Sequence, residues 1–133
     1  MNKLDKESVL GISALLVHAA NIDEIYSEHE KSLIKDFIKS YLTNDDENKI
    51  LKKAEEIENN SNQLLNYTNI IKENSLEIKK NIIEHLWKVI ISDNTVDQYE
   101  SNLMRRICGL IYFSDKECAE IKLKLINNKW HIL

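Results

Sequence analysis

Residues 27–42 read SEHEKSLIKDFIKSYL, and this stretch indicates the fold of the whole chain. Its apolar residues recur at the spacing that places them on one face of an α-helix. Ser27 is followed three positions later by Glu30, which is the spacing of a capping box. In that motif the two side chains satisfy free backbone amides where a helix begins. The stretch therefore predicts an amphipathic helix that begins close to Glu28.

The same pattern returns 70 positions later. Residues 97–112 read DQYESNLMRRICGLIY, and Asp97 with Glu100 repeats the capping spacing. Further pairs with this offset are Asn44/Ser114, Glu47/Glu117, Leu33/Leu103, Asp23/Asp93 and Leu16/Leu86. An offset that holds over caps and apolar positions without a gap predicts one structural unit written twice.

The same periodicity extends over nearly the whole chain and predicts an all-α fold. We expect a compact bundle of about seven helices in a single domain over residues 1–133. Two three-helix units, at about 9–57 and 79–126, are related by a pseudo-twofold axis, with a linker helix at about 62–72. Asn44 with Glu47 and Ser114 with Glu117 predict two further capping boxes.

The composition excludes several classes of protein. The chain has 133 residues, no proline, two glycines and a net charge of −4. Two glycines cannot build a glycine-rich phosphate loop, and the scarcity of turn residues argues against a β-sandwich or barrel. With this negative net charge, the chain lacks the excess of basic residues that is typical of a protein that binds nucleic acid. We expect a globular domain that binds no nucleic acid.

The first apolar run and the two cysteines bear on location. Val9–Ala20 is too short to span a bilayer, and Asp5 and Glu7 occupy what would be the basic leader of a signal peptide. We therefore expect no membrane insertion and a cytoplasmic location. Cys108 and Cys118 lack the spacing of a zinc site, and two reduced, buried thiols are favoured over a disulfide.

The joint between the first two helices of each unit holds the candidate site. Capping explains Glu30 and, in the second unit, Asp97 and Glu100. Asp23 and Asp93 differ, because each follows the negative end of a helix and needs a compensating partner. That partner is either local backbone amides in an Asx turn or a hard divalent cation, Ca²⁺ or Mg²⁺.

These joints also carry a family resemblance. Residues 19–30 (AANIDEIYSEHE) and 86–100 (LWKVIISDNTVDQYE) resemble the paired A-D-G-x-[IV]-x-x-x-E loops of the TerB-like proteins, the tellurite-resistance TerB family and its relatives. The resemblance implies a seven-helix bundle with an internal repeat and no assigned catalytic activity. It also implies divalent-cation sites in the acidic loops. Its metal positions are Asp23, Glu30, Asp93 and Glu100, with Asp97 as an extra acid in the second copy.

The loops depart from the family pattern at one position. The glycine after the loop aspartate is replaced by Glu24 in the first copy and by Asn94 in the second. Asparagine tolerates a positive φ, whereas glutamate would be strained there by roughly 1–2 kcal/mol. A cation site is therefore expected to be stronger in the second copy.

The sequence offers no catalytic motif, and we expect a protein that is not an enzyme. Its histidines lack metal-ligand spacing, and no serine or cysteine has a local nucleophile signature. The leading hypothesis is a stress-associated module that binds a divalent cation or another protein. The alternative is a structural protein–protein interaction domain whose acidic loops only cap helices. Trp130, close to the C-terminal end, either packs on the bundle or contacts such a partner.

Overall fold

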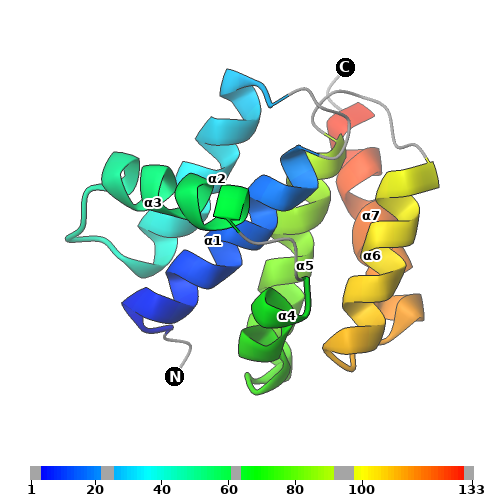
Figure 1. Ribbon diagram of the computed structural model, residues 1–133. Helices are drawn as coiled ribbons and strands as arrows, with labels where there is room; N and C mark the ends of the chain where they lie inside the picture. The colour runs from blue at the N-terminus through cyan, green and yellow to red at the C-terminus, as the bar shows by residue number, and fades with distance from the viewer. Residues whose placement is uncertain (1–3, 22–25, 61–63, 92–97, 131–133) are drawn as a thin grey trace.

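The computed structural model describes residues 4–21, 26–60, 64–91 and 98–130, of which 60, 64–66, 98–100 and 128–130 are described by their backbone alone. Within these ranges the chain forms seven α-helices and no strand, which confirms the predicted all-α class (Figure 1). They are α1 (Lys6–Ala20), α2 (Glu28–Tyr41), α3 (Glu47–Asn60), α4 (Leu64–Lys72), α5 (Leu76–Ile90), α6 (Gln98–Leu110) and α7 (Asp115–Trp130).

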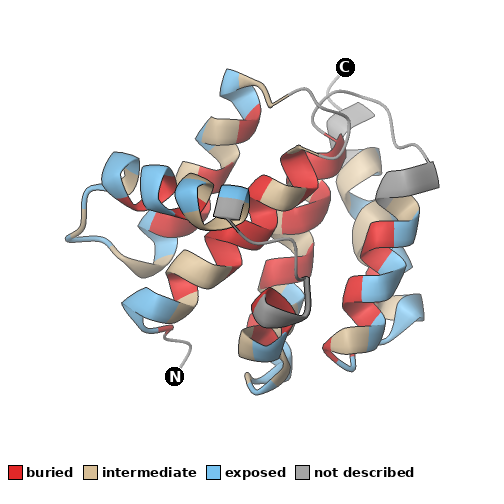
Figure 2. Ribbon diagram, in the orientation of Figure 1, coloured by how far each residue is buried: buried red, intermediate tan, exposed pale blue. Residues whose placement is uncertain are grey.

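Two central helices organise the bundle. α1 packs against α2, α3, α4 and α5, while α5 also contacts α2 and α7. Figure 1 shows α2 and α3 on one side of this pair and α6 and α7 on the other. Buried residues concentrate on α1 and α5 (Figure 2). α1 buries residues on all its sides, including Val9, Ile12 and Leu16, because other helices surround it.

The helix starts are set by side-chain caps. Asp5 accepts a hydrogen bond from the amide of Ser8 at 2.7 Å, and Ser75 accepts one from the amide of Ile78 at 3.3 Å. These caps satisfy amides that have no partner within the helix. Of the capping box predicted for Ser114 with Glu117, the serine half is confirmed, because Ser114 Oγ accepts from the Glu117 amide at 3.3 Å.

The predicted capping box of Asn44 with Glu47 is wrong. α3 begins at Glu47 itself, and Asp46 caps it by accepting from the Asn48 amide at 2.9 Å. The chain is still turning before that point, since the Asp45 amide donates to the carbonyl of Leu42 at 3.3 Å. A helix could therefore not begin directly after Asn44.

α6 ends in a Schellman motif that reverses the chain into α7. The amide of Phe113 donates to the carbonyl of Cys108 at 2.8 Å, and the amide of Tyr112 donates to that of Gly109 at 3.4 Å. Tyr112 has a φ of 58°, the left-handed conformation that glycine or asparagine normally supplies at this position. The turn makes α6 and α7 a tight helical hairpin.

The linker helix α4 lies close to α1 at a glycine. A Cβ on Gly11 would lie 2.5 Å from Cδ1 of Ile70, so the absence of a side chain lets α4 approach.

No helix in the described ranges is long and apolar enough to cross a membrane.

Candidate functional site

The predicted site is the joint where α1 ends and α2 begins, alongside α3. α1 ends at Ala20, and the amide of its C-cap, Asn21, donates to the carbonyl of Val17 at 3.0 Å. The described chain resumes at Tyr26 and enters α2 through Ser27. Asp23 lies between these points, outside the described residues.

The capping box of α2 is formed as predicted. Glu30 Oε1 accepts hydrogen bonds from the backbone amide of Ser27 at 2.8 Å and from its hydroxyl at 3.1 Å. In return, Ser27 Oγ accepts from the amide of Glu30 at 3.1 Å. Glu30 is buried, with 6% of its surface exposed. One carboxylate oxygen is therefore engaged in holding the start of α2.

Tyr26 anchors this helix start to the core. Its ring packs against the buried cluster, and the ammonium of Lys31 lies 5.0 Å from the ring centroid. Burial, followed by the neighbouring Glu55 carboxylate on α3, raises the pKa of Tyr26 well above its usual range. The phenol therefore stays protonated. Tyr26 thus holds the joint against the helix that it precedes.

A polar cluster beside the joint was missed by sequence reasoning. Glu58 of α3 accepts from the side-chain amide of Asn21 at 3.4 Å and lies 3.3 Å from Nδ1 of His18. The side chain of Glu58 is only 14% exposed. The available signal was the position of Glu55 and Glu58 beside the core residues of α3. Glu58 meets the end of α1, and Glu55 meets Tyr26.

The five predicted metal ligands have different outcomes. Asp23, Asp93 and Asp97 lie outside the described residues, and Glu100 is described by its backbone alone. Glu30 is held in the capping box. Over the described ranges, no three side chains of His, Cys, Asp or Glu lie close enough together to hold a metal ion. The part of the joint that is described is thus a structural cap.

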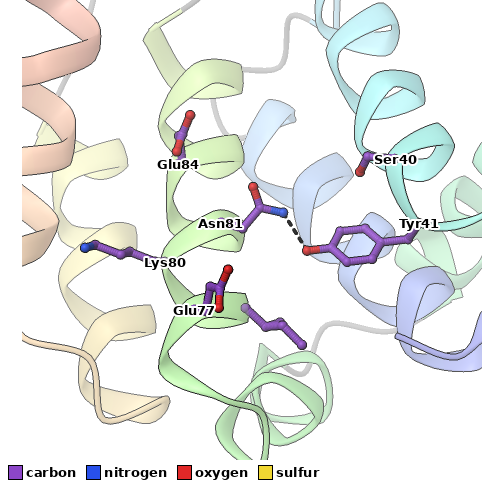
Figure 3. Close-up of a pocket in the computed structure, with 7 residues that line it drawn as sticks. Ser40, Tyr41, Glu77, Lys80, Asn81 and Glu84 are labelled. Carbon is purple, nitrogen blue, oxygen red and sulfur yellow. Dashed lines mark hydrogen bonds between the residues drawn. The ribbon is translucent and has the colours of Figure 1, made fainter. Parts of the chain in front are cut away.

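A groove of about 440 Å³ lies between the end of α2 and the first half of α5 (Figure 3). Asn81 donates from its side-chain amide to the hydroxyl of Tyr41 across it. Glu77, Asn81 and Glu84 line the groove from α5. Lys80 also lines it, and its ammonium extends toward α6 (Figure 3). Sequence reasoning missed this groove, since its residues come from helices about 40 positions apart.

His85 lies behind this groove as part of the packing between α2 and α5. Its ring stands edge-on to that of Phe37, with centroids 5.1 Å apart, and Nδ1 donates to the carbonyl of Asn81 at 2.8 Å. Burial lowers the pKa of His85, so the ring is neutral at pH 7. His85 is therefore a packing residue between the two helices.

A second cluster joins α5 to the α6–α7 hairpin. Trp87 is buried, and its indole N–H lies 3.2 Å from the carbonyl oxygen and 3.3 Å from Sγ of Cys118. These contacts lie within the second of the two predicted three-helix units. Cys108 and Cys118 are both free and buried, as predicted.

The comparisons with known proteins identify one family. The model of a family described as "Tellurite resistance protein TerB" matches residues 10–123. This range runs from α1 into α7 and covers most of the chain. No curated protein and no solved structure matches it.

Proposed function

Because the chain belongs to the TerB family, we propose that it is a non-catalytic helical module that binds another protein during a tellurite-type stress response in the cytoplasm. In this proposal the acidic joint is an architectural element. It fixes the direction in which α2 leaves α1, and thereby the shape of the surface that a partner meets.

One observation carries this proposal. The Glu30 carboxylate, the only predicted ligand whose side chain is described, accepts both the amide and the hydroxyl of Ser27. A carboxylate that serves a helix N-terminus in this way is already stabilised by the helix dipole and by two donors. No bound ion is needed to explain its burial.

The test compares cells that do or do not express the chain at increasing tellurite. Wild type and the double variant Asp23→Asn/Asp93→Asn should protect equally, and in-cell crosslinking should yield the same single partner with both. Loss of protection in the double variant, with its unfolding midpoint unchanged, would contradict a purely architectural joint. Absence of protection by the wild type would overturn the proposal as a whole.

A divalent-cation site is the second candidate. Asp23 follows the last residue of α1 by three positions, and Asp93 follows that of α5 by three, so both come after electronegative helix ends. The largely buried Glu58 carboxylate beside Asn21 favours the idea, because it adds oxygen ligands of the kind that Ca²⁺ and Mg²⁺ prefer.

Calorimetry with Ca²⁺ and with Mg²⁺ decides this second candidate. If a cation binds, titration of the wild type should release or absorb heat, and its melting temperature should rise. Asp93→Asn should weaken both effects. Glu58→Gln tests the contribution of α3 to the first joint in the same assay. An unchanged melting temperature and no heat at millimolar ion would remove the cation site.

We further infer that the domain is a duplicated three-helix unit. The bounds of α1 and α5 differ by 70 at both ends, and the caps Asp5 and Ser75 differ by 70 as well. α2 and α6 begin 70 positions apart, at Glu28 and Gln98. These bounds support the repeat, while α3 and α7 begin 68 apart, at 47 and 115. A measured structure whose two units superimpose would establish it.

A further inference from the structure

We propose that Cys108 and Cys118 form a redox pair, in which a hydroperoxide oxidises Cys118 and Cys108 then closes an intramolecular disulfide. This role is independent of the acidic joint and of the partner proposed above. It rests on the contact between the two thiols, on the donors around one of them and on the groove that reaches it.

The α6–α7 hairpin brings the two thiols together. Cys108 lies in the last turn of α6, and its carbonyl accepts the Phe113 amide in the Schellman motif. Cys118 is the fourth residue of α7, and its amide donates to the carbonyl of Ser114 at 3.0 Å. Across this hairpin the thiol of Cys108 donates a hydrogen bond to the sulfur of Cys118. A disulfide between them would close within the hairpin, across ten positions of the sequence.

The surroundings make the two thiols chemically unequal. The Cys118 sulfur accepts hydrogen bonds from Cys108 and from the indole N–H of Trp87 at 3.3 Å. The ammonium of Lys122, one helical turn further along α7, lies 5.2 Å from the centroid of the Trp87 ring. The hydrogen bond from Cys108 is the main cause that lowers the pKa of Cys118, whereas the same bond and burial raise that of Cys108. Asp115 is the opposing charge and raises the pKa of both thiols.

The two thiols also differ in how far they can be reached from solvent. A groove of about 400 Å³ between α5, α6 and α7 is lined by Cys118, Trp87, Met104, Arg105 and Lys122, among others. Cys118 is 6% exposed, whereas Cys108 is fully buried. A small peroxide can therefore meet the Cys118 sulfur first. Thiolate character and access together select which cysteine is oxidised.

The chemistry balances in two steps. The Cys118 thiolate attacks one peroxide oxygen and the O–O bond breaks. The other oxygen leaves as hydroxide from hydrogen peroxide, or as alkoxide from an organic hydroperoxide, and takes up a proton. Cys118 is then a sulfenic acid. The Cys108 sulfur attacks the Cys118 sulfur and displaces hydroxide, which leaves as water with the Cys108 thiol proton. The protein has lost two hydrogen atoms and gained one S–S bond, and any dithiol reductant restores the thiols.

The experiment treats the full chain with hydrogen peroxide and follows its intact mass and its thiol content under denaturing conditions. We expect the wild type to lose both thiols together and to become lighter by two hydrogen atoms, with reversal by dithiothreitol. Cys108→Ser keeps a hydroxyl donor toward Cys118 and should stop at a sulfenic acid that dimedone traps at position 118. Cys108→Ala removes that donor, so the same sulfenic acid should form more slowly. Cys118→Ser should stay unmodified under the same conditions.

A variant of the donor separates this role from simple exposure. Trp87→Phe keeps an aromatic ring but removes the N–H donor, so the pKa of Cys118 should rise and oxidation should slow by up to about tenfold at neutral pH. Arg106→Ala, an exposed change on α6 outside the lining of the groove, should leave the rate unchanged. Dimedone trapping at Cys108 instead of Cys118, or disulfides only between two chains, would overturn the proposal.

Discussion

The side-chain amide of Asn81 donates a hydrogen bond to the phenol oxygen of Tyr41, and this bond joins α5 to α2. Both residues are part buried, and the ring of Tyr41 lies 5.2 Å from that of Phe37 in the adjoining core. The contact is therefore a polar link between segments that are about 40 residues apart in sequence.

Tyr41→Phe should destabilise the domain by about 1 kcal/mol, the net value of a typical hydrogen bond of this kind. Urea unfolding of Tyr41→Phe, Asn81→Ala and the double variant measures the coupling directly. The sum of the losses in unfolding free energy of the two single variants should exceed the loss in the double variant. Strict additivity would show that the bond contributes nothing to stability.

Ser27→Ala and Glu30→Gln should each weaken the start of α2 by about 1 kcal/mol, the usual value of an N-cap. In thermal unfolding, each variant should lose nearly the same stability in EDTA as in millimolar Ca²⁺ or Mg²⁺, because the carboxylate caps the helix. Ser32→Ala, an exposed change within the same helix, is the control. If Glu30→Gln is less stable than the wild type only when the cation is added, Glu30 instead belongs to a metal site.

The stability of the domain should fall on acidification because of His85. Burial lowers its pKa in the folded state below the unfolded value, so the unfolded chain binds the proton more readily. The contribution of neutral His85 is complete above the unfolded pKa of about 6.5 and is lost as pH falls toward the folded value, with a slope of at most about 1.4 kcal/mol per pH unit.

Urea midpoints between pH 7.5 and 5.5 check this slope, and His85→Gln is the comparison. The variant should start less stable at pH 7.5 but lose less on acidification than the wild type. Parallel curves for the two proteins would mean that another group accounts for the pH dependence.

Gly109→Ala should stabilise the domain by about 0.5–1 kcal/mol, because alanine favours a helix and nothing lies within 4 Å of the added Cβ. Gly11→Ala should lack that gain, because its Cβ would meet Ile70 of α4. Ile70→Val removes the opposing methyl, so combining it with Gly11→Ala should cost less than the two changes made separately. Melting temperatures of the four variants provide the test, and an equal gain at both glycines would refute the close approach.

Local signals predicted most of the fold. Apolar periodicity located all seven helices, and the Ser27–Glu30 spacing gave a box that forms in full. The start of α3 was misplaced because Asn44 and Asp46 both have cap chemistry, and a spacing rule cannot tell which one ends the preceding turn. That choice depends on where α2 stops, which is a matter of its packing on α1 and α5.

The candidate site was less accessible to such reasoning. The joint was found through its repeated acids, but the neighbours that surround it, His18 and Glu58, come together only when α3 folds against α1. The contact of Cys118 with Trp87 likewise spans 31 positions. Pairings of this kind have no local pattern in one sequence, since the side chains share neither a helix nor a spacing.

The left-handed backbone of Tyr112 has a consequence for engineering the hairpin. Its side chain is 74% exposed, yet its conformation sets where α6 stops and how soon α7 can start. A surface change there, such as Tyr112→Gly, would relieve about 1 kcal/mol of backbone strain. The same change would remove the ring that lies 5.0 Å from the ammonium of Lys72 on α4, so one surface position governs both the reversal of the chain and its tether to the linker helix.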